Sequence, residues 1–168
     1  MKAKQRAGSL TQELVLREAI GKNPGINIWT DSYMRETIRL LITIALGLGL
    51  RFSQILGIKI PDIDFKRKTI SVNATKCNGI KIKLLIPDDM AKYINKYINK
   101  YRANCSGSKN RDYLFVSKHS QIPLSINTIL KALRTLGDEV SGLPGNYSPN
   151  LLRSIYINRY IIQPKNNR

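Results

Sequence analysis

Residues 40–58 read LLITIALGLGLRFSQILGI, an apolar run that is interrupted by a single charged residue, Arg51. The apolar residues on both sides of Arg51 recur at helical spacing, which predicts two buried helical segments that meet at this arginine. A guanidinium is costly to remove from water unless an anionic group meets it. Arg51 is therefore either a surface arginine whose aliphatic stem covers the core, or a residue that binds an anion.

The chain combines a globular composition with a large positive charge. Its 168 residues fit one domain, and a hydrophobic content of 42% excludes general disorder. Lys and Arg number 28 against 11 Asp and Glu, which gives a formal net charge of +17. Such an excess favours a polyanionic partner. Because the basic residues are spread along the whole chain rather than along one amphipathic helix, nucleic acid is a better candidate than an anionic membrane.

The sequence favours neither a metal site nor a membrane segment. Cys77 and Cys105 lack C-x-x-C spacing and have no histidine nearby, so we expect no metal, no cofactor and no required disulfide. The basic residues 1–6 are not followed by a signal-type apolar region, and residues 40–50 are too short to span a bilayer. We expect a cytoplasmic protein that neither enters a membrane nor binds a small-molecule substrate.

Hydrophobic periodicity predicts helices on both sides of one β-hairpin. Residues 69–75 and 80–86 alternate as strands do, and the Asn-Gly pair between them is a strong hairpin signal. Helices are predicted to begin near Ser9, Asp31 or Ser32, Ser53, Asp88 or Asp89, Ser125 and Ser148-Pro149. The fold class is therefore α+β, mostly helical, with one small antiparallel β-meander. We predict a flexible basic tail at residues 1–8 and one domain over residues 9–168.

Four segments of the chain resemble motifs of one enzyme family, the tyrosine recombinases or phage integrases. The family patterns are G-L-R-x-S-E-L-L-x-L, T-K-T-G-K, L-F-x-S-x-x-G-x-P-L-S and T-P-H-x-L-R. In the same order, this chain has GLRFSQILGI at 49–58, TKCNG at 75–79, LFVSKH followed by PLS at 114–125, and YSPNLLR at 147–153. The resemblance implies that residues 9–168 form a partial tyrosine-recombinase catalytic domain without the amino-terminal core-binding domain.

The resemblance also implies the roles of three residues. Arg51 and Arg153 would hold the scissile phosphate, a task that suits the arginine fork because it binds two phosphate oxygens at once. Lys76 would protonate the leaving 5′ oxygen. We expect Arg51 and Arg153 to face one shared concavity, with Lys76 on a mobile hairpin at its rim. Taken alone, each of these residues is equally compatible with an ordinary surface role.

The chain departs from the family pattern in several places. Asn150 stands where the family has His, and Gln54 replaces the usual Glu, which we expect to weaken the support of Arg51. In the family an L-G-H motif and the nucleophilic tyrosine follow the second arginine by several helical turns, whereas this sequence stops before them. Tyr156 and Tyr160 follow Arg153 by only three and seven residues, on or near its helix face. We expect both tyrosines to pack or to contact phosphate rather than to attack it.

Three functions are compatible with these features. The leading hypothesis is a site-specific recombinase or integrase homologue, from a system such as a mobile element, that binds double-stranded DNA but does not cleave it alone. Whether the chain is an enzyme therefore stays open. A second hypothesis is a non-catalytic regulator or accessory DNA-binding protein, whose protein partner would be a full-length recombinase or a second copy. The third is a basic RNA-binding module whose motif resemblance is accidental.

Overall fold

A computed structural model describes residues 31–74, 79–105, 112–119, 122–139 and 149–157. The predicted basic tail, the helix predicted near Ser9 and the tip of the predicted hairpin, with Lys76, lie outside the described residues. Within the described residues, the architecture is mostly helical with one three-stranded antiparallel sheet, which confirms the predicted fold class.

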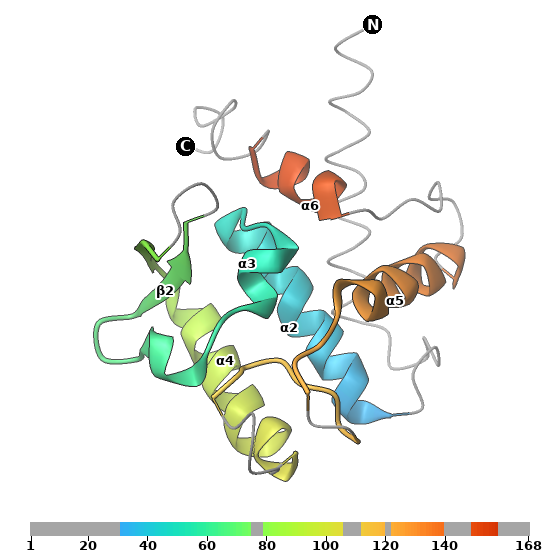
Figure 1. Cartoon of the computed structure of the whole chain (residues 1–168), viewed down its shortest axis with the longest axis horizontal. Helices are drawn as coiled ribbons and strands as arrows, with labels where there is room; N and C mark the ends of the chain where they lie inside the picture. Colours follow the sequence, from blue (N-terminus) through green and yellow to red (C-terminus); the bar gives the residue numbers. More distant parts are fainter. Residues whose placement is uncertain (1–30, 75–78, 106–111, 120–121, 140–148, 158–168) are drawn as a thin grey trace, which may run out of the picture.

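Helix α2 (Ser32–Leu48) runs through the middle of the structure, and the other elements pack around it (Figure 1). The helix begins where predicted, because the Asp31 side chain accepts a hydrogen bond from the Tyr33 N–H at 3.0 Å. Most of its apolar residues are almost completely inaccessible to solvent; these are Ile38, Leu40, Leu41, Ile42, Ile44, Ala45 and Leu46. No helix of the described part of the chain is both long enough and apolar enough to cross a membrane.

The sheet has the strand order β1-β2-β3 and consists of β1 (Ile63–Asp64), β2 (Thr69–Asn73) and β3 (Lys81–Leu85). Neighbouring strands pair in antiparallel fashion, with Ile70 opposite Ile63 on one side and Leu84 on the other. Ile70 and Val72 of the central strand are buried, whereas the edge strand β3 is largely exposed. The predicted meander is confirmed, and both long strands are shorter than their sequence patterns suggest.

Helix α4 (Asp88–Lys100) lies along α2, and its start differs from the prediction. The N-cap is Pro87 rather than Asp88 or Asp89, and no side chain caps the helix. Both aspartates lie instead in the first turn, where a carboxylate is favoured by the helix dipole without capping the chain. The 3₁₀ helix η2 (Arg102–Asn104) follows directly after α4.

Three further α-helices and the 3₁₀ helix η1 (Ile60–Asp62) complete the described structure. The short helix α3 (Phe52–Leu56) follows α2, and α5 (Ile126–Glu139) packs against α3. Ser125 caps α5 as predicted, since its hydroxyl accepts a hydrogen bond from the Thr128 N–H at 3.2 Å. Helix α6 (Pro149–Tyr156) has proline at its first position, as predicted, and packs against α2. The sheet and α5 lie on different sides of α3 in Figure 1, and α6 lies near the end of α2 that leads into α3.

Candidate functional site: the junction of α2, α3 and α6

Arg51 lies in the turn between α2 and α3. Helix α2 ends at Gly49, whose φ of 62° is the left-handed conformation that terminates many helices and that favours glycine. Leu50 and Phe52 on either side of the arginine are 5% and 2% exposed, so the turn is fixed to the core by its apolar residues. Arg51 itself is exposed. The sequence pattern therefore places a surface guanidinium on a well-anchored backbone.

Arg153 lies on α6, a helix of eight residues that is held by its apolar side. Leu152 and Ile155 of this helix are 0% and 2% exposed, and they attach it to the core next to α2. Arg153 is half-buried, and Asn150, at the position where the family has His, is exposed in the first turn. An exposed asparagine has no proton of suitable acidity to donate, so Asn150 does not take over the general-acid chemistry of a histidine.

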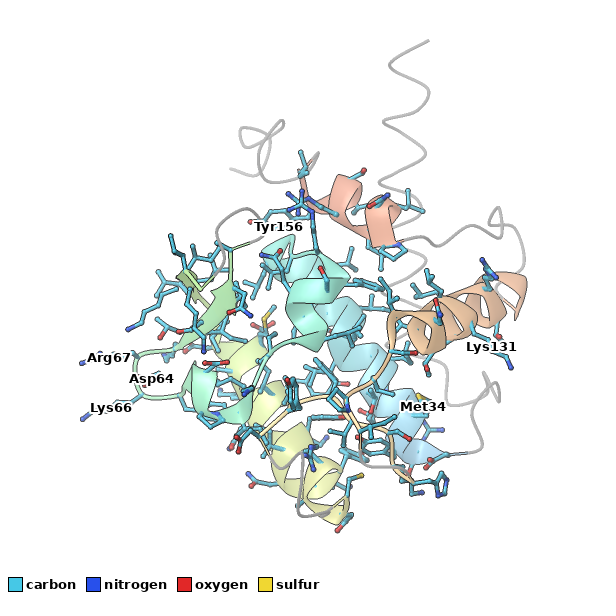
Figure 2. All side chains as sticks on the ribbon, viewed as in Figure 1. Met34, Asp64, Lys66, Arg67, Lys131 and Tyr156 are labelled. Carbon is cyan, nitrogen blue, oxygen red and sulfur yellow. The ribbon has the colours of Figure 1, made fainter. Side chains whose placement is uncertain are left out.

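Gly49 and Tyr156 bring these two segments together. A Cβ atom on Gly49 would lie only 2.1 Å from Cδ1 and 2.5 Å from Cε1 of Tyr156, so the tyrosine ring packs directly on the glycine backbone. Gly49 is two residues before Arg51, and Tyr156 is three residues after Arg153 on the same helix. Figure 2 labels Tyr156 where α6 faces α3. The turn that carries Arg51 and the helix that carries Arg153 are therefore in direct contact.

The sequence did not predict this contact, although Tyr156 was expected either to pack or to contact phosphate. The available signal was the glycine of the G-L-R pattern, since a glycine there is needed both for the positive φ and for the close approach of an aromatic ring. The pairing of Gly49 with Tyr156 in particular depends on how α6 packs on α2, which local sequence does not specify.

Gln54 contacts the Arg51 turn as well. Its Oε1 accepts a hydrogen bond from the Arg51 N–H at 3.0 Å, and its Nε2 donates to the carbonyl oxygen of Asn73 at 2.8 Å. Asn73 is the last residue of β2, and Lys76 follows it by three positions in the sequence. The structure does not describe residues 75–78, so the predicted place of Lys76 at the site stays a prediction.

Tyr33, Tyr93 and Tyr97, which lie away from the Arg51 turn, are buried or partly buried, and their hydroxyls form hydrogen bonds. Tyr33 donates to the Val116 carbonyl at 2.8 Å, and Tyr97 shares a 2.7 Å hydrogen bond with the Thr37 hydroxyl. Burial raises the pKa of Tyr33 and raises that of Tyr97 to about 12. Burial and the neighbouring Glu36 carboxylate raise the pKa of Tyr93. These hydroxyls therefore stay protonated and buried or partly buried, which does not suit a nucleophile.

The described residues contain no group of three or more His, Cys, Asp or Glu side chains that could hold a metal ion. His119 is exposed in the segment before α5, and Cys105 is a buried free thiol. The chemistry of the junction is therefore that of two arginines, an asparagine, a glutamine and a tyrosine.

Comparison with known proteins identifies the family. The model of the phage integrase family matches residues 27–162, which include Arg51 and Arg153 with every described helix and strand. The chain belongs to the phage integrase family. Tyrosine recombinase XerA of Saccharolobus solfataricus is 30% identical over 122 residues, which cover 73% of this chain and 36% of XerA. The chain thus spans about a third of the length of this curated relative.

Solved structures of integrase-family proteins share the fold. XerH recombinase bound to its difH substrate superimposes with a TM-score of 0.71 at 17% identity, over 91% of this chain and 41% of XerH. The Tn1549 transposon integrase in complex with transposon right-end DNA gives a TM-score of 0.69 at 17% identity, over 94% of this chain and 53% of the integrase. The described fold is therefore that of a tyrosine-recombinase catalytic domain, as the motifs predicted.

Proposed function

We propose that this chain binds double-stranded DNA through the surface that carries Arg51 and Arg153, as part of a site-specific recombination or integration system. The packing of Tyr156 on Gly49 carries the proposal, because it joins the two segments whose arginines the family motif assigns to one phosphate. Two guanidinium forks on anchored backbones suit a phosphodiester, whose two free oxygens each accept hydrogen bonds. The net charge of +17 adds a general attraction to the DNA backbone.

The similar structures support DNA as the partner. XerH was solved with difH and the Tn1549 integrase with transposon right-end DNA. The second of these belongs to a transposon, in line with an origin of this chain in a mobile element. We further propose a cytoplasmic location, which is where DNA recombination systems of cells without a nucleus operate.

We also propose that the 168-residue chain does not cleave DNA by itself. Cleavage by this family's route requires a tyrosine oxygen to attack phosphorus in line with the P–O5′ bond, while the leaving 5′ oxygen takes a proton. Tyr156 lies on the same helix as Arg153, with its ring against Gly49. A tyrosine in line with the leaving 5′ oxygen, such as one supplied by a full-length recombinase, would then be needed to complete the reaction, with Lys76 as the expected proton donor.

The DNA-binding proposal is tested by fluorescence anisotropy with a labelled duplex over a series of salt concentrations. We expect the paired variant Arg51→Ala/Arg153→Ala to weaken binding by about tenfold or more, since charge-assisted hydrogen bonds to phosphate are lost. The slope of log affinity against log salt should also fall by about two. The charge-matched control is Lys131→Ala/Arg134→Ala, two exposed residues on α5. Equal losses in both paired variants would refute a defined site at the junction.

The cleavage proposal is tested with a nicked suicide duplex that traps any phosphotyrosyl adduct, read on a denaturing gel. We expect no covalent band from the chain alone. Any covalent band from the chain alone would overturn the proposal, and its loss in Tyr156→Phe or Tyr160→Phe would identify the nucleophile. If a full-length recombinase is added, a band that depends on Arg51 and Arg153 of this chain indicates a shared active site. DNA binding without such a band favours the alternative function, a non-catalytic regulator that uses the same surface.

A further inference from the structure

Gln54 forms a bridge between two elements that are separate in the sequence. Its amide oxygen accepts from the Arg51 N–H at 3.0 Å, at the start of α3. Its amide nitrogen donates to the Asn73 carbonyl at 2.8 Å, at the end of β2. One half-buried side chain thus connects the turn that carries Arg51 with the strand that leads toward Lys76.

Both ends of this bridge are otherwise well held. Phe52 and Ile55 fix α3 in the core with 2% and 0% exposure. Asn73 pairs with Lys81 in the register of β2 and β3, and the next residue, Ala74, donates its N–H to the Ile80 carbonyl at 2.8 Å. A side chain that bonds to two anchored backbone segments restrains their relative position strongly. The segments themselves have little conformational freedom left through which they could move apart.

The chemistry of the bridge requires an amide. The Arg51 N–H needs an acceptor and the Asn73 carbonyl needs a donor, and a glutamine side chain supplies one of each. An ionised glutamate, the usual residue of the family motif, only accepts hydrogen bonds. At this position it would bring a negative oxygen against the Asn73 carbonyl oxygen and lose the second bond.

We propose that Gln54 is a positioning residue that sets the Arg51 turn relative to the end of β2. The effect of Gln54 on DNA binding rests on the proposed function. In place of the weaker support of Arg51 that we expected from the sequence, the amide then holds the Arg51 turn to the end of β2, whereas a carboxylate would hold only the Arg51 N–H.

The first experiment measures the bridge in the free protein, without DNA. Hydrogen–deuterium exchange is followed in wild type, Gln54→Leu and Gln54→Glu at pH 7.5. We expect faster exchange in the peptides that contain the Arg51 N–H and the β2–β3 pairing in both variants, with α4 unchanged. The matched control is Asn99→Leu, which removes an exposed amide-to-amide hydrogen bond of 3.1 Å between Asn99 and Asn95 within α4. It should leave the peptides around Arg51 as in wild type.

The exchange of the Gln54→Glu variant should depend on pH, whereas an effect caused only by lost packing should not. A protonated glutamate has one donor and one acceptor, as glutamine has, so it restores both hydrogen bonds. The carbonyl of Asn73 disfavours the ionised form of the new carboxyl and the Arg51 N–H favours it, so we expect this carboxyl to take up its proton near the ordinary glutamate pKa of about 4.3. The difference in exchange between Gln54→Glu and wild type should therefore be present at pH 7.5 and disappear near pH 4. The difference for Gln54→Leu should persist at both values.

The second experiment measures duplex binding by anisotropy at pH 7.5. Both Gln54 variants should bind several-fold more weakly than wild type, and Gln54→Leu should keep the wild-type salt slope, because it deletes no phosphate contact and changes no charge. The leucine variant shows that the loss is not caused by an added negative charge. If exchange around Arg51 matches wild type in both variants, the positioning role is overturned, whatever the DNA affinity. If exchange changes but the wild-type chain binds no DNA, the proposed function fails and the role of Gln54 in it falls as well.

Discussion

The two ends of α2 use tyrosines in opposite ways. Near its N-terminal end, Tyr33 and Tyr97 are 4% and 0% exposed, and their hydroxyls bond to the Val116 carbonyl and to Thr37. At its C-terminal end, Tyr156 lies on the surface side of Gly49, beside the turn with the exposed Arg51. In the first case the polar groups are satisfied inside the core. In the second, aromatic packing holds in place the backbone that leads to an exposed arginine.

The residues at the two ends of α2 therefore serve different purposes: those at the N-terminal end contribute to stability, and those at the C-terminal end contribute to the proposed binding of DNA. Side chains that are buried with their polar partners contribute to folding but offer nothing to a ligand. An exposed arginine on an anchored turn presents its guanidinium at the surface, where an anion can approach it. We therefore expect substitutions at the N-terminal end of α2 to change the free energy of unfolding, and substitutions at its C-terminal end to change DNA affinity as well.

The largest effect is expected at Phe115, which packs at the N-terminal end with its ring centroid 5.9 Å from that of Tyr97. The side chain is fully buried, so Phe115→Ala should lower the free energy of unfolding by about 3–5 kcal/mol. Urea denaturation measures this change. DNA affinity of the protein that remains folded should stay near the wild-type value. The exposed Ile122 is the control, since Ile122→Ala removes an apolar side chain that is 56% exposed. A loss below about 1 kcal/mol for Phe115→Ala would contradict the assignment of this end to the core.

A smaller effect, on both the free energy of unfolding and the DNA affinity, is expected at Gly49. Gly49→Ala forces a side chain into the left-handed region and against the Tyr156 ring, so the free energy of unfolding should fall by about 1–3 kcal/mol. The duplex affinity should fall too, because the Arg51 turn has to move. Gly57→Ala is the matched control: this glycine follows α3 at φ −82°, a backbone conformation that alanine adopts readily, and its added Cβ would lie 3.3 Å from the Ser53 carbonyl oxygen rather than 2.1 Å from a ring atom.

A double-mutant cycle sharpens this result. If the Tyr156 ring causes part of the loss, Gly49→Ala should cost less in a Tyr156→Ala background than in wild type. Strictly additive free energies would mean that only backbone strain acts, and the contact between the two arginine-bearing segments would then lose its support.

The smallest effect is expected at Asp31, the cap at the other end of α2. Burial opposes ionisation of Asp31, but hydrogen bonds from Lys118 and the Tyr33 N–H outweigh it and lower the pKa of the carboxyl. Because the folded pKa lies below the unfolded value, the stabilisation is present above the unfolded pKa, about 3.9, and is lost as the pH falls through the folded pKa.

Asp31→Ala should therefore cost about 1 kcal/mol at neutral pH, as other N-cap deletions do. Thermal melts of wild type and variant should converge below about pH 4, as the wild-type carboxylate takes up its proton. Curves that stay equally far apart at every pH would show that the charge of Asp31 does not contribute. Duplex affinity should be unaffected at neutral pH.

Local patterns in the sequence predicted most elements of the fold. The Asp31 and Ser125 caps, the proline at the start of α6 and the alternation of residues 69–73 act within a few residues of themselves, so they can be recognised without a structure. The cap of α4 was predicted wrongly, because two consecutive aspartates are equally compatible with a cap and with a first turn. The arginines were recognised by the motifs around them, and not by charge.

What the sequence determined by itself is the set of helices and strands, the positive charge, the junction at Arg51 and the family. Hydrophobic period, turn residues and motif order are all local properties of a chain. Only the tertiary structure decided that Tyr156 packs on Gly49 and that Gln54 reaches Asn73. These contacts join residues far apart in the sequence, and they form because the buried faces of α3 and α6 can be covered in only a few ways by the core around α2.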